Sequence, residues 1–193
     1  MKQLLSRLLL AATLCLGLNG LAGAEGVRLL MKTNLGDIEL ELDADRAPET
    51  SKNFLRYVDE GYYNGTIFHR VINSFMIQGG GFTPDLQKKP THAAIRNEAK
   101  NGLKNQRGTI AMARTNAPHS ATAQFFINHV DNDALDYPGQ DGWGYTVFGR
   151  VTAGMDTVDR IADVYTVTRG SYANVPEKPV LIESISRVPE TKQ

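Results

Sequence analysis

An arginine embedded in an apolar stretch is the side chain with the clearest capacity for chemistry in this sequence. The stretch covers residues 68–81 and reads FHRVINSFMIQGGG. Its alternation of apolar residues predicts a strand on which Phe68, Arg70 and Ile72 share one face. A guanidinium among apolar side chains must be paired or put to use, because an isolated buried charge is costly. Gln78 can hold Arg70 in a fixed orientation, since its amide carries both donors and an acceptor.

The neighbouring residues predict how the chain positions that arginine. His69 and Val71 fall on the opposite face of the strand. The Asn-Ser pair at 73–74 is typical of a turn, and residues 75–78 predict a second short strand that pairs back on the first. The three glycines at 79–81 permit backbone conformations or close approaches that a Cβ would forbid. Together these elements predict an apolar pocket with one oriented cation.

Other kinds of chemistry have little support in the sequence. The four histidines are His69, His92, His119 and His129. They form neither the H-E-x-x-H pattern nor a tight cluster with other ligand residues, so we expect no metal site. The glycines lack the lysine and hydroxyl residue of a phosphate loop, and no serine lies in a G-x-S-x-G setting, so we expect no cofactor and no nucleophile. Asp131, Asp133 and Asp136 lack the glycine and glutamate of an EF-hand and are expected to initiate turns.

A reaction that needs no nucleophile fits the residues that remain. These residues are Arg70, Phe75, Met76, Gln78, Phe126 and Leu135. Rotation about an X-Pro bond is such a reaction, with a barrier of about 20 kcal/mol that arises from amide resonance. An apolar pocket could hold the proline ring while a guanidinium donates to the prolyl nitrogen, which accepts well only when the resonance is broken. The alternative is that Arg70 belongs to a structural ion pair and the aromatic residues to an ordinary core.

The first 24 residues predict a secretory signal peptide (residues 1–24). Lys2 and Arg7 precede an apolar run over residues 8–18, and the segment ends with Ala-Gly-Ala at 22–24. The run is too short for an ordinary membrane span, which needs about 20 residues. We therefore expect cleavage and no stable membrane anchor, with an uncleaved anchor as the alternative.

Cleavage would leave residues 25–193 as a single domain. That domain has no cysteine, because Cys15 is the only one in the chain and leaves with the signal peptide. It carries 19 basic and 21 acidic residues, a formal net charge of −2. This balance offers no electrostatic reason to bind nucleic acid or an anionic membrane.

The remaining pattern predicts many short strands and two helices. Further strands are expected over residues 27–33, 37–42, 109–113, 124–128, 144–151 and 180–188. A hairpin loop over 34–36 joins the first two of them. One helix is expected from Pro48 to Gly61 with Asp45 as its cap, and a second over 155–163. Such a pattern is typical of a β-barrel or sandwich with helical plugs.

Three long motifs resemble the cyclophilin family of peptidyl-prolyl cis-trans isomerases, and more narrowly its single-domain bacterial members. They are FHRVINSFMIQGGG, GTIAMARTNAPHSATAQFFIN and GYTVFGRV. The resemblance covers essentially all of residues 27–188. It implies a mainly β fold, a closed eight-stranded antiparallel β-barrel capped by two α-helices, so that residues 25–193 form a cyclophilin-like isomerase domain.

The resemblance also implies roles for individual residues. Arg70 and Gln78 fall on the catalytic positions of the family. The substrate-binding positions fall on Phe75, Met76, Ala113, Arg114, Gln124, Phe126, Leu135 and Tyr145. At Ala113 and Arg114 the family pairs its backbone with the residue before proline, and Arg114 stands where eukaryotic members commonly have asparagine.

Two departures from the family pattern bear on ligands. Ala134 stands where the family often has tryptophan or phenylalanine, and Tyr145 stands where it frequently has histidine. The first removes a hydrogen-bond donor and an apolar wall used for the cyclic drug cyclosporin, so we expect weak cyclosporin binding. The second keeps an aromatic ring with a polar tip, so catalysis should persist.

The combined expectation is a monomeric, exported isomerase that acts on proline-containing polypeptides while other exported proteins fold. We expect it in the periplasm, with full secretion as the alternative. A second hypothesis is a peptide-binding chaperone module that uses the same groove with little turnover. A purely structural role would need no open pocket, and the oriented arginine argues against it.

Overall fold

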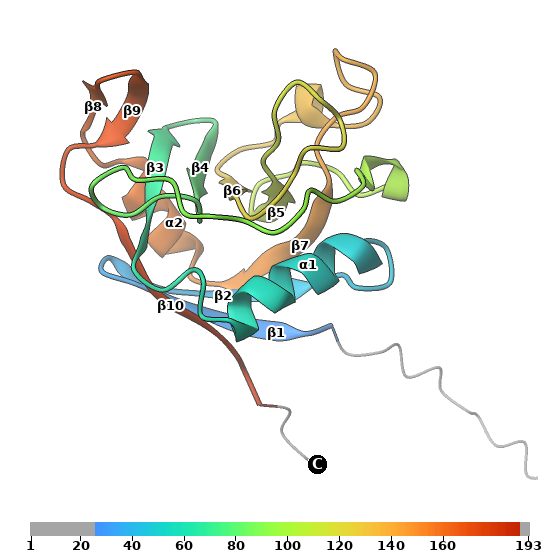
Figure 1. Cartoon of the computed structure of the whole chain (residues 1–193), viewed down its shortest axis with the longest axis horizontal. Helices are drawn as coiled ribbons and strands as arrows, with labels where there is room; N and C mark the ends of the chain where they lie inside the picture. Colours follow the sequence, from blue (N-terminus) through green and yellow to red (C-terminus); the bar gives the residue numbers. More distant parts are fainter. Residues whose placement is uncertain (1–25, 190–193) are drawn as a thin grey trace, which may run out of the picture.

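The computed structural model describes residues 26–189, and the predicted signal peptide lies outside this range. Its elements are β1 Arg28–Thr33, β2 Gly36–Leu42, α1 Pro48–Asp59, β3 Thr66–Ile72, β4 Met76–Gly79, the 3-10 helix η1 Ala99–Asn101, β5 Thr109–Met112, β6 Phe125–Asn128, the 3-10 helix η2 Asp133–Leu135, β7 Val147–Ala153, α2 Met155–Ala162, β8 Thr166–Arg169, β9 Tyr172–Pro176 and β10 Leu181–Arg187 (Figure 1). None of the helices in this range is long and apolar enough to cross a membrane.

Eight of the strands close into an antiparallel barrel. Around the barrel their order is β1-β10-β3-β4-β6-β5-β7-β2, and each neighbouring pair is antiparallel. Closure leaves no unpaired strand edge, because the last strand in the order pairs with the first. The predicted fold class, a closed eight-stranded antiparallel barrel with two α-helices, is confirmed.

The barrel core follows from the period-2 alternation of the strands. On β2, Ile38, Leu40 and Leu42 are at most 1% exposed, and the residues between them face outward. Phe54 of α1 closes the core against the rings of Tyr63, Phe125 and Phe148, at centroid distances of 4.9, 5.5 and 5.1 Å. Each such side chain contributes about 1.5–3 kcal/mol through burial.

The two α-helices lie at opposite ends of β2. Gly36 at the start of β2 lies against Thr157 and Arg160 of α2, whereas α1 follows the other end of the strand. The predicted start of α1 at Pro48 and its end before Gly61, which has a φ of +64°, are confirmed. Each helix therefore covers one end of the barrel.

The predicted cap of α1 is wrong. The N-cap position is Ala47, which makes no side-chain hydrogen bond, and Asp45 does not take this role. Instead, the carboxylate of Glu98, from a loop far along the chain, accepts the backbone N–H groups of Glu49 and Thr50 at 3.1 and 2.8 Å. A negative charge here also interacts favourably with the positive N-terminal end of the helix dipole.

The prediction that Phe68 shares a face of β3 with Arg70 is wrong, because β3 contains a β-bulge. Phe68 pairs with Gly79 and Arg70 pairs with Gln78, although Phe68 and Arg70 are two residues apart and Gln78 and Gly79 only one. His69 is therefore an extra residue on β3 without a partner on β4. The extra residue reverses the alternation, and Phe68 points into the core with Val71 rather than outward with Arg70. Arg70 and Ile72 remain together on the outer face.

The β8–β9 hairpin was missing from the sequence-based prediction. It stands beside β3 (Figure 1), and Tyr172 places the edge of its ring against Phe82 at 5.3 Å. A Gly-Ser pair at 170–171 between two β-rich runs is a signal that could have revealed it. The loop between β1 and β2 is also one residue shorter than predicted, because Gly36 already pairs with Thr33.

Candidate active site

A small apolar cluster lies on the outer face of the barrel, apart from the main core. Its buried members are Met76, Ala111, Phe126 and Val147, each at most 3% exposed. Partly buried side chains surround them, namely Ile72, Phe75, Leu103, Ala113, Leu135 and Tyr145. A second apolar cluster outside the main core, with partly exposed side chains at its border, is a candidate binding surface. We call these ten residues the outer-face cluster.

Strand alternation separates this cluster from the core. On β6, Phe125 and Ile127 belong to the core, whereas Phe126 between them belongs to the outer-face cluster. On β4, Ile77 points inward and Met76 outward. Because neighbouring residues of a strand point to opposite faces, a run that is apolar throughout serves both sides of the barrel wall.

Arg70 borders the cluster and is held from one side by two glutamines. Its Nη1 donates to Oε1 of Gln78, the cross-strand partner, over a long 3.4 Å. Gln78 in turn donates from Nε2 to Oε1 of Gln124 at 3.0 Å. The predicted support of Arg70 by Gln78 is therefore present. A Cβ on Gly81 would collide with the Gln124 side chain, so any other residue there would displace Gln124.

No ion pair within residues 26–189 involves Arg70. The alternative that this arginine belongs to a structural ion pair therefore has no support in the part of the chain described. A half-buried guanidinium with free donors beside apolar side chains can bind a hydrogen-bond acceptor on a ligand.

Backbone hydrogen bonds and a ring contact fix the aromatic residues of the cluster. The carbonyl of Phe75 accepts from the backbone N–H of His129 at 3.0 Å and from Nδ2 of Asn132 at 2.9 Å. Tyr145 places the edge of its ring on Phe126, with centroids 5.7 Å apart at 78°. These contacts hold the aromatic side chains of the cluster in place without a ligand.

The two residues after β5 play different parts. The N–H of Ala113 already donates to the carbonyl of Gln124 at 3.0 Å, which leaves the Ala113 carbonyl as the backbone group open to a ligand. The Arg114 side chain is only 3% exposed and stacks on the ring of Tyr145, with Cζ 4.4 Å from its centroid. All ten residues that the sequence pointed to thus lie on this face, but the Arg114 side chain faces protein.

Four members of the outer-face cluster were missed by the sequence reasoning. They are Ile72, Leu103, Ala111 and Val147. For Ala111 and Val147 a signal exists, because they alternate with the core residues Ile110 and Phe148 on β5 and β7. Leu103 comes from the long loop before β5, and no local pattern places it there.

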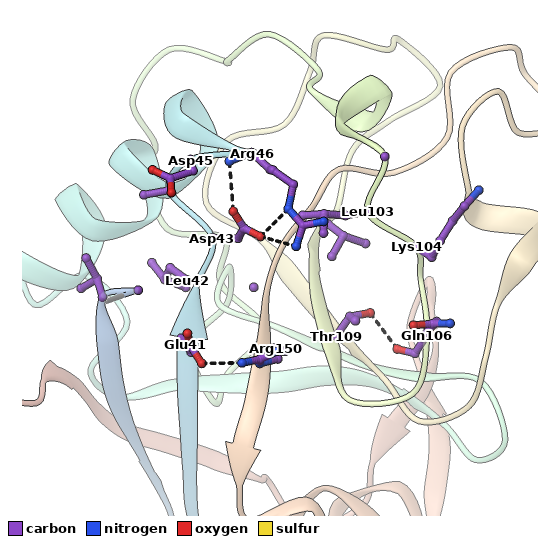
Figure 2. Close-up of a pocket in the computed structure, with 16 residues that line it drawn as sticks. Glu41, Leu42, Asp43, Asp45, Arg46, Leu103, Lys104, Gln106, Thr109 and Arg150 are labelled. Carbon is purple, nitrogen blue, oxygen red and sulfur yellow. Dashed lines mark hydrogen bonds and ion pairs between the residues drawn. The ribbon is translucent and has the colours of Figure 1, made fainter. Parts of the chain in front are cut away.

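A cavity of about 650 Å³ lies between β2, β7 and the loop before β5 (Figure 2). Leu103 and Val147 of the outer-face cluster are among the residues that line it. Two of its three acidic side chains are paired, Asp43 with Arg46 at 2.7 Å and Glu41 with Arg150 at 2.9 Å. None of the ten predicted site residues lines it. Among residues 26–189 no group of three or more His, Cys, Asp or Glu side chains is placed to hold a metal ion.

His69, the extra residue of the bulge, is buried directly beside Arg70. Its ring lies on Phe82 with centroids 4.5 Å apart, and its Nδ1 has no hydrogen-bond partner among the described residues. Burial, assisted by the positive charge of Arg70, lowers the pKa of His69 from 6.5 to about 4. The imidazole is therefore neutral at physiological pH and adds no second cation next to Arg70.

This pKa predicts an acid-dependent loss of stability. Between pH 6.5 and pH 4 the unfolded chain protonates this histidine and the folded chain does not. The free energy of unfolding should therefore fall by up to roughly 3 kcal/mol as the pH is lowered through this range. Urea unfolding of the natural protein and of His69→Gln across these pH values isolates the contribution. Equal slopes in the two proteins would contradict the prediction.

The sequence is similar to a known family and to proteins of that family. A family profile described as "Cyclophilin type peptidyl-prolyl cis-trans isomerase/CLD" matches residues 28–187. The chain is 61% identical over 156 residues to peptidyl-prolyl cis-trans isomerase B of Escherichia coli (strain K12), covering 80% of this chain and 95% of that protein. It is 59% identical over 156 residues to isomerase cyp18 of Streptomyces antibioticus, covering 80% and 94% of the two chains.

A solved structure is similar as well. It is a cyclophilin-type peptidyl-prolyl cis-trans isomerase of Cryptosporidium parvum, crystallised in the presence of the dipeptide Ala-Pro. It superposes with a TM-score of 0.73 and 28% sequence identity, over 84% of this chain and 99% of that chain.

Proposed function

The chain belongs to the cyclophilin-type peptidyl-prolyl cis-trans isomerase family, and we propose that it isomerises X-Pro bonds by binding proline in the outer-face cluster beside Arg70. The activity itself, peptidyl-prolyl cis-trans isomerisation, follows from the family and from relatives of about 60% identity. The observation that carries the proposed site is a guanidinium without an ion-pair partner among the described residues, at the border of the apolar outer-face cluster. The dipeptide in the Cryptosporidium structure supports proline-containing polypeptides as ligands.

The proposed mechanism uses one differential hydrogen bond. Met76 and Phe126 bury the proline ring, which fixes one side of the X-Pro bond. Arg70 then donates to the prolyl nitrogen. In the planar amide this nitrogen shares its lone pair with the carbonyl and accepts poorly, whereas in the twisted transition state the lone pair is localised. The contact therefore strengthens as the bond rotates and lowers the barrier.

Gln78 and Gln124 are proposed to orient rather than to react. The chain of hydrogen bonds from Arg70 through Gln78 to Gln124 limits the directions in which the guanidinium can point. The carbonyl of Ala113 is proposed to pair with the backbone before proline. Tyr145, Phe75 and Leu135 would form the remaining walls of the pocket.

Magnetisation-exchange spectroscopy on a short X-Pro peptide tests this function directly, because it reads isomerisation without a coupled protease. Catalytic amounts of the natural protein should bring cis–trans exchange, otherwise tens of seconds, to well below a second. If the peptide resonances shift on binding while exchange stays slow, the protein is the binding module of the second hypothesis.

The place of action is proposed from the N-terminal segment alone. The predicted signal peptide supports export to the periplasm and assistance to the folding of other exported proteins. The mature protein isolated from the periplasmic fraction should begin at Glu25 and sediment as a monomer. An N-terminus at Met1 in the cytoplasmic fraction would exclude this location.

Cyclosporin should bind weakly. Ala134 lies exposed in η2 beside Leu135, and its methyl group offers neither the donor nor the apolar wall that an aromatic residue would supply. Titration calorimetry checks this, and a nanomolar dissociation constant for the natural protein would contradict it. The variant Ala134→Trp should bind at least about tenfold more tightly, because burying an indole face contributes 1.5–3 kcal/mol or so.

A further inference from the structure

Each of the three nitrogens of the Arg114 guanidinium donates to an acceptor of the protein. Its Nε donates to the carbonyl of Gly144 at 3.0 Å, its Nη1 to the carbonyl of Thr115 at 3.0 Å, and its Nη2 pairs with the carboxylate of Asp141. One face of the guanidinium stacks on Tyr145 at 4.4 Å. A planar fork that meets three acceptors and an aromatic ring at once has no lysine equivalent.

Two of the three acceptors of Arg114, the Gly144 carbonyl and the Asp141 carboxylate, belong to one loop, residues 136–144, which joins η2 to β7. Within it, Oδ1 of Asp141 also accepts the backbone N–H groups of Trp143 and Gly144 at 3.0 and 3.2 Å. Hydrogen bonding to Arg114 is the main cause that lowers the pKa of Asp141 to about 2, so this carboxylate is ionised at physiological pH. The Asp141 carboxylate thus holds the tip of the loop through its own backbone N–H groups and links it to Arg114.

The end of the loop cannot relax freely. Gly144 has a φ of +69°, and a Cβ on it would lie 2.6 Å from the backbone of Asp136 and Tyr137. Its carbonyl accepts from Nδ2 of Asn97 at 3.1 Å in addition to Arg114. The residue that follows Gly144 is Tyr145, so whatever fixes this carbonyl also fixes the tyrosine.

The loop closes on two walls of the proposed proline pocket. The backbone N–H of Tyr145 donates to the carbonyl of Leu135 at 2.8 Å, which joins the residues on either side of the loop. The Tyr145 ring then contacts Phe126. A displacement of the loop would therefore be transmitted to Leu135, Tyr145 and the face of Phe126.

We propose that Arg114 is a positioning residue. Its side chain fixes the 136–144 loop, so that Tyr145 and Leu135 stay in position as walls of the proline pocket. Its guanidinium does not contact substrate. This inference rests on the proposed function of the pocket. The expectation from the sequence concerned the backbone at Arg114, and this inference gives the side chain a separate role. The ion pair with Asp141 also neutralises the charge, so Arg114 does not select acidic residues before proline.

A double-mutant cycle separates positioning from substrate contact. We expect Arg114→Ala to lower kcat/KM for an X-Pro peptide by roughly 10- to 100-fold, mainly through KM, because the wall of the pocket is displaced. In a Tyr145→Ala background the same substitution should cost several-fold less, because one of the two walls through which it acts is already gone and only the effect on Leu135 remains. An undiminished effect in that background would overturn the proposal.

Charge and geometry are separated by a second pair of measurements. Arg114→Lys keeps the positive charge but not the fork, and it should behave like Arg114→Ala. Peptides with glutamate and with alanine before proline should lose activity equally in both variants. Recovery by lysine, or a selective loss for the glutamate peptide, would show that Arg114 reads substrate and would contradict the proposal.

Two controls guard against a general loss of structure. Arg150→Ala removes an exposed arginine that pairs with Glu41 away from the pocket, and it should leave activity unchanged. If Arg114→Ala does not fold, its exposed ion-pair partner can be replaced instead, as Asp141→Asn. This variant should show a smaller loss of kcat/KM, which again diminishes in the Tyr145→Ala background. The NMR signals of the Tyr145 ring should shift in either variant, while those of the core residue Tyr63 should not.

The failure of the proposed function would be distinguishable from the failure of this inference. The natural protein is assayed first, and an absence of catalysed exchange refutes the function without involving Arg114. The role of Arg114 is then measured as the dissociation constant of the same peptide across the same double-mutant cycle. An additive cycle by this measure would refute the inference alone.

Discussion

Replacing Arg70 with alanine is expected to lower kcat/KM for X-Pro isomerisation by roughly 10²- to 10³-fold, the usual loss when a donor to a developing charge or lone pair is removed. The loss should fall mainly on kcat, because the planar amide gains little from this contact. Binding of the same peptide should weaken only slightly, since the apolar walls remain. Magnetisation exchange gives the rates, and titration of the peptide resonances gives the affinity.

Stability should hardly change in this variant. Arg70 is half-buried and makes one long hydrogen bond of 3.4 Å, so its removal leaves no buried partner without a bond. Arg56→Ala is the matched control, because Arg56 is an exposed arginine that pairs with Glu60 on α1. It should retain full activity. Full activity in Arg70→Ala would exclude the proposed mechanism.

Adjacent phenylalanines of β6 are expected to give opposite phenotypes when each is replaced by alanine. Phe126→Ala should lower kcat/KM by roughly 10- to 100-fold, because the proline ring loses the aromatic face on which it packs. Its cost in stability should be roughly 1–2 kcal/mol, since the space it leaves opens on to a pocket that water can fill.

Phe125→Ala should instead reduce the free energy of unfolding by about 3–5 kcal/mol. Phe125 is fully buried and contacts the rings of Phe54 and Tyr63, both at 5.5 Å, so its loss leaves a closed cavity in the core. The molecules that remain folded should keep most of their activity. Urea unfolding and exchange rates on both variants are sufficient to check this, and similar phenotypes would contradict the assignment of the two faces.

Much of the architecture could be predicted from local patterns. Alternation along residues 37–42 and 180–188 predicts strands with one buried face, and Pro48 and Gly61 bracket the first helix correctly. The predicted turn at Asn73 and Ser74 is also present between β3 and β4. These predictions succeed because period, turn residues and helix-ending glycines report backbone geometry within a few residues of themselves.

The candidate site could be predicted as a set of residues but not as an arrangement. Arg70, Gln78 and Gln124 stand out in the motifs, and the structure links them by hydrogen bonds. The inward direction of Phe68 could not be predicted, because a bulge arises from how β3 pairs with β4 rather than from β3 itself.

The sequence alone determined the strand and helix types and, through its resemblance to a family, the closed-barrel class, and it supplied the candidate residues of the proposed pocket. Tertiary structure alone decided the partners that lie far apart in the chain: Glu98 rather than Asp45 at the start of α1, and Asp141 and Tyr145 around Arg114. The physical reason is that periodicity encodes which way a side chain leaves its own strand or helix. Which charge or ring it meets there depends on segments brought together only when the barrel closes.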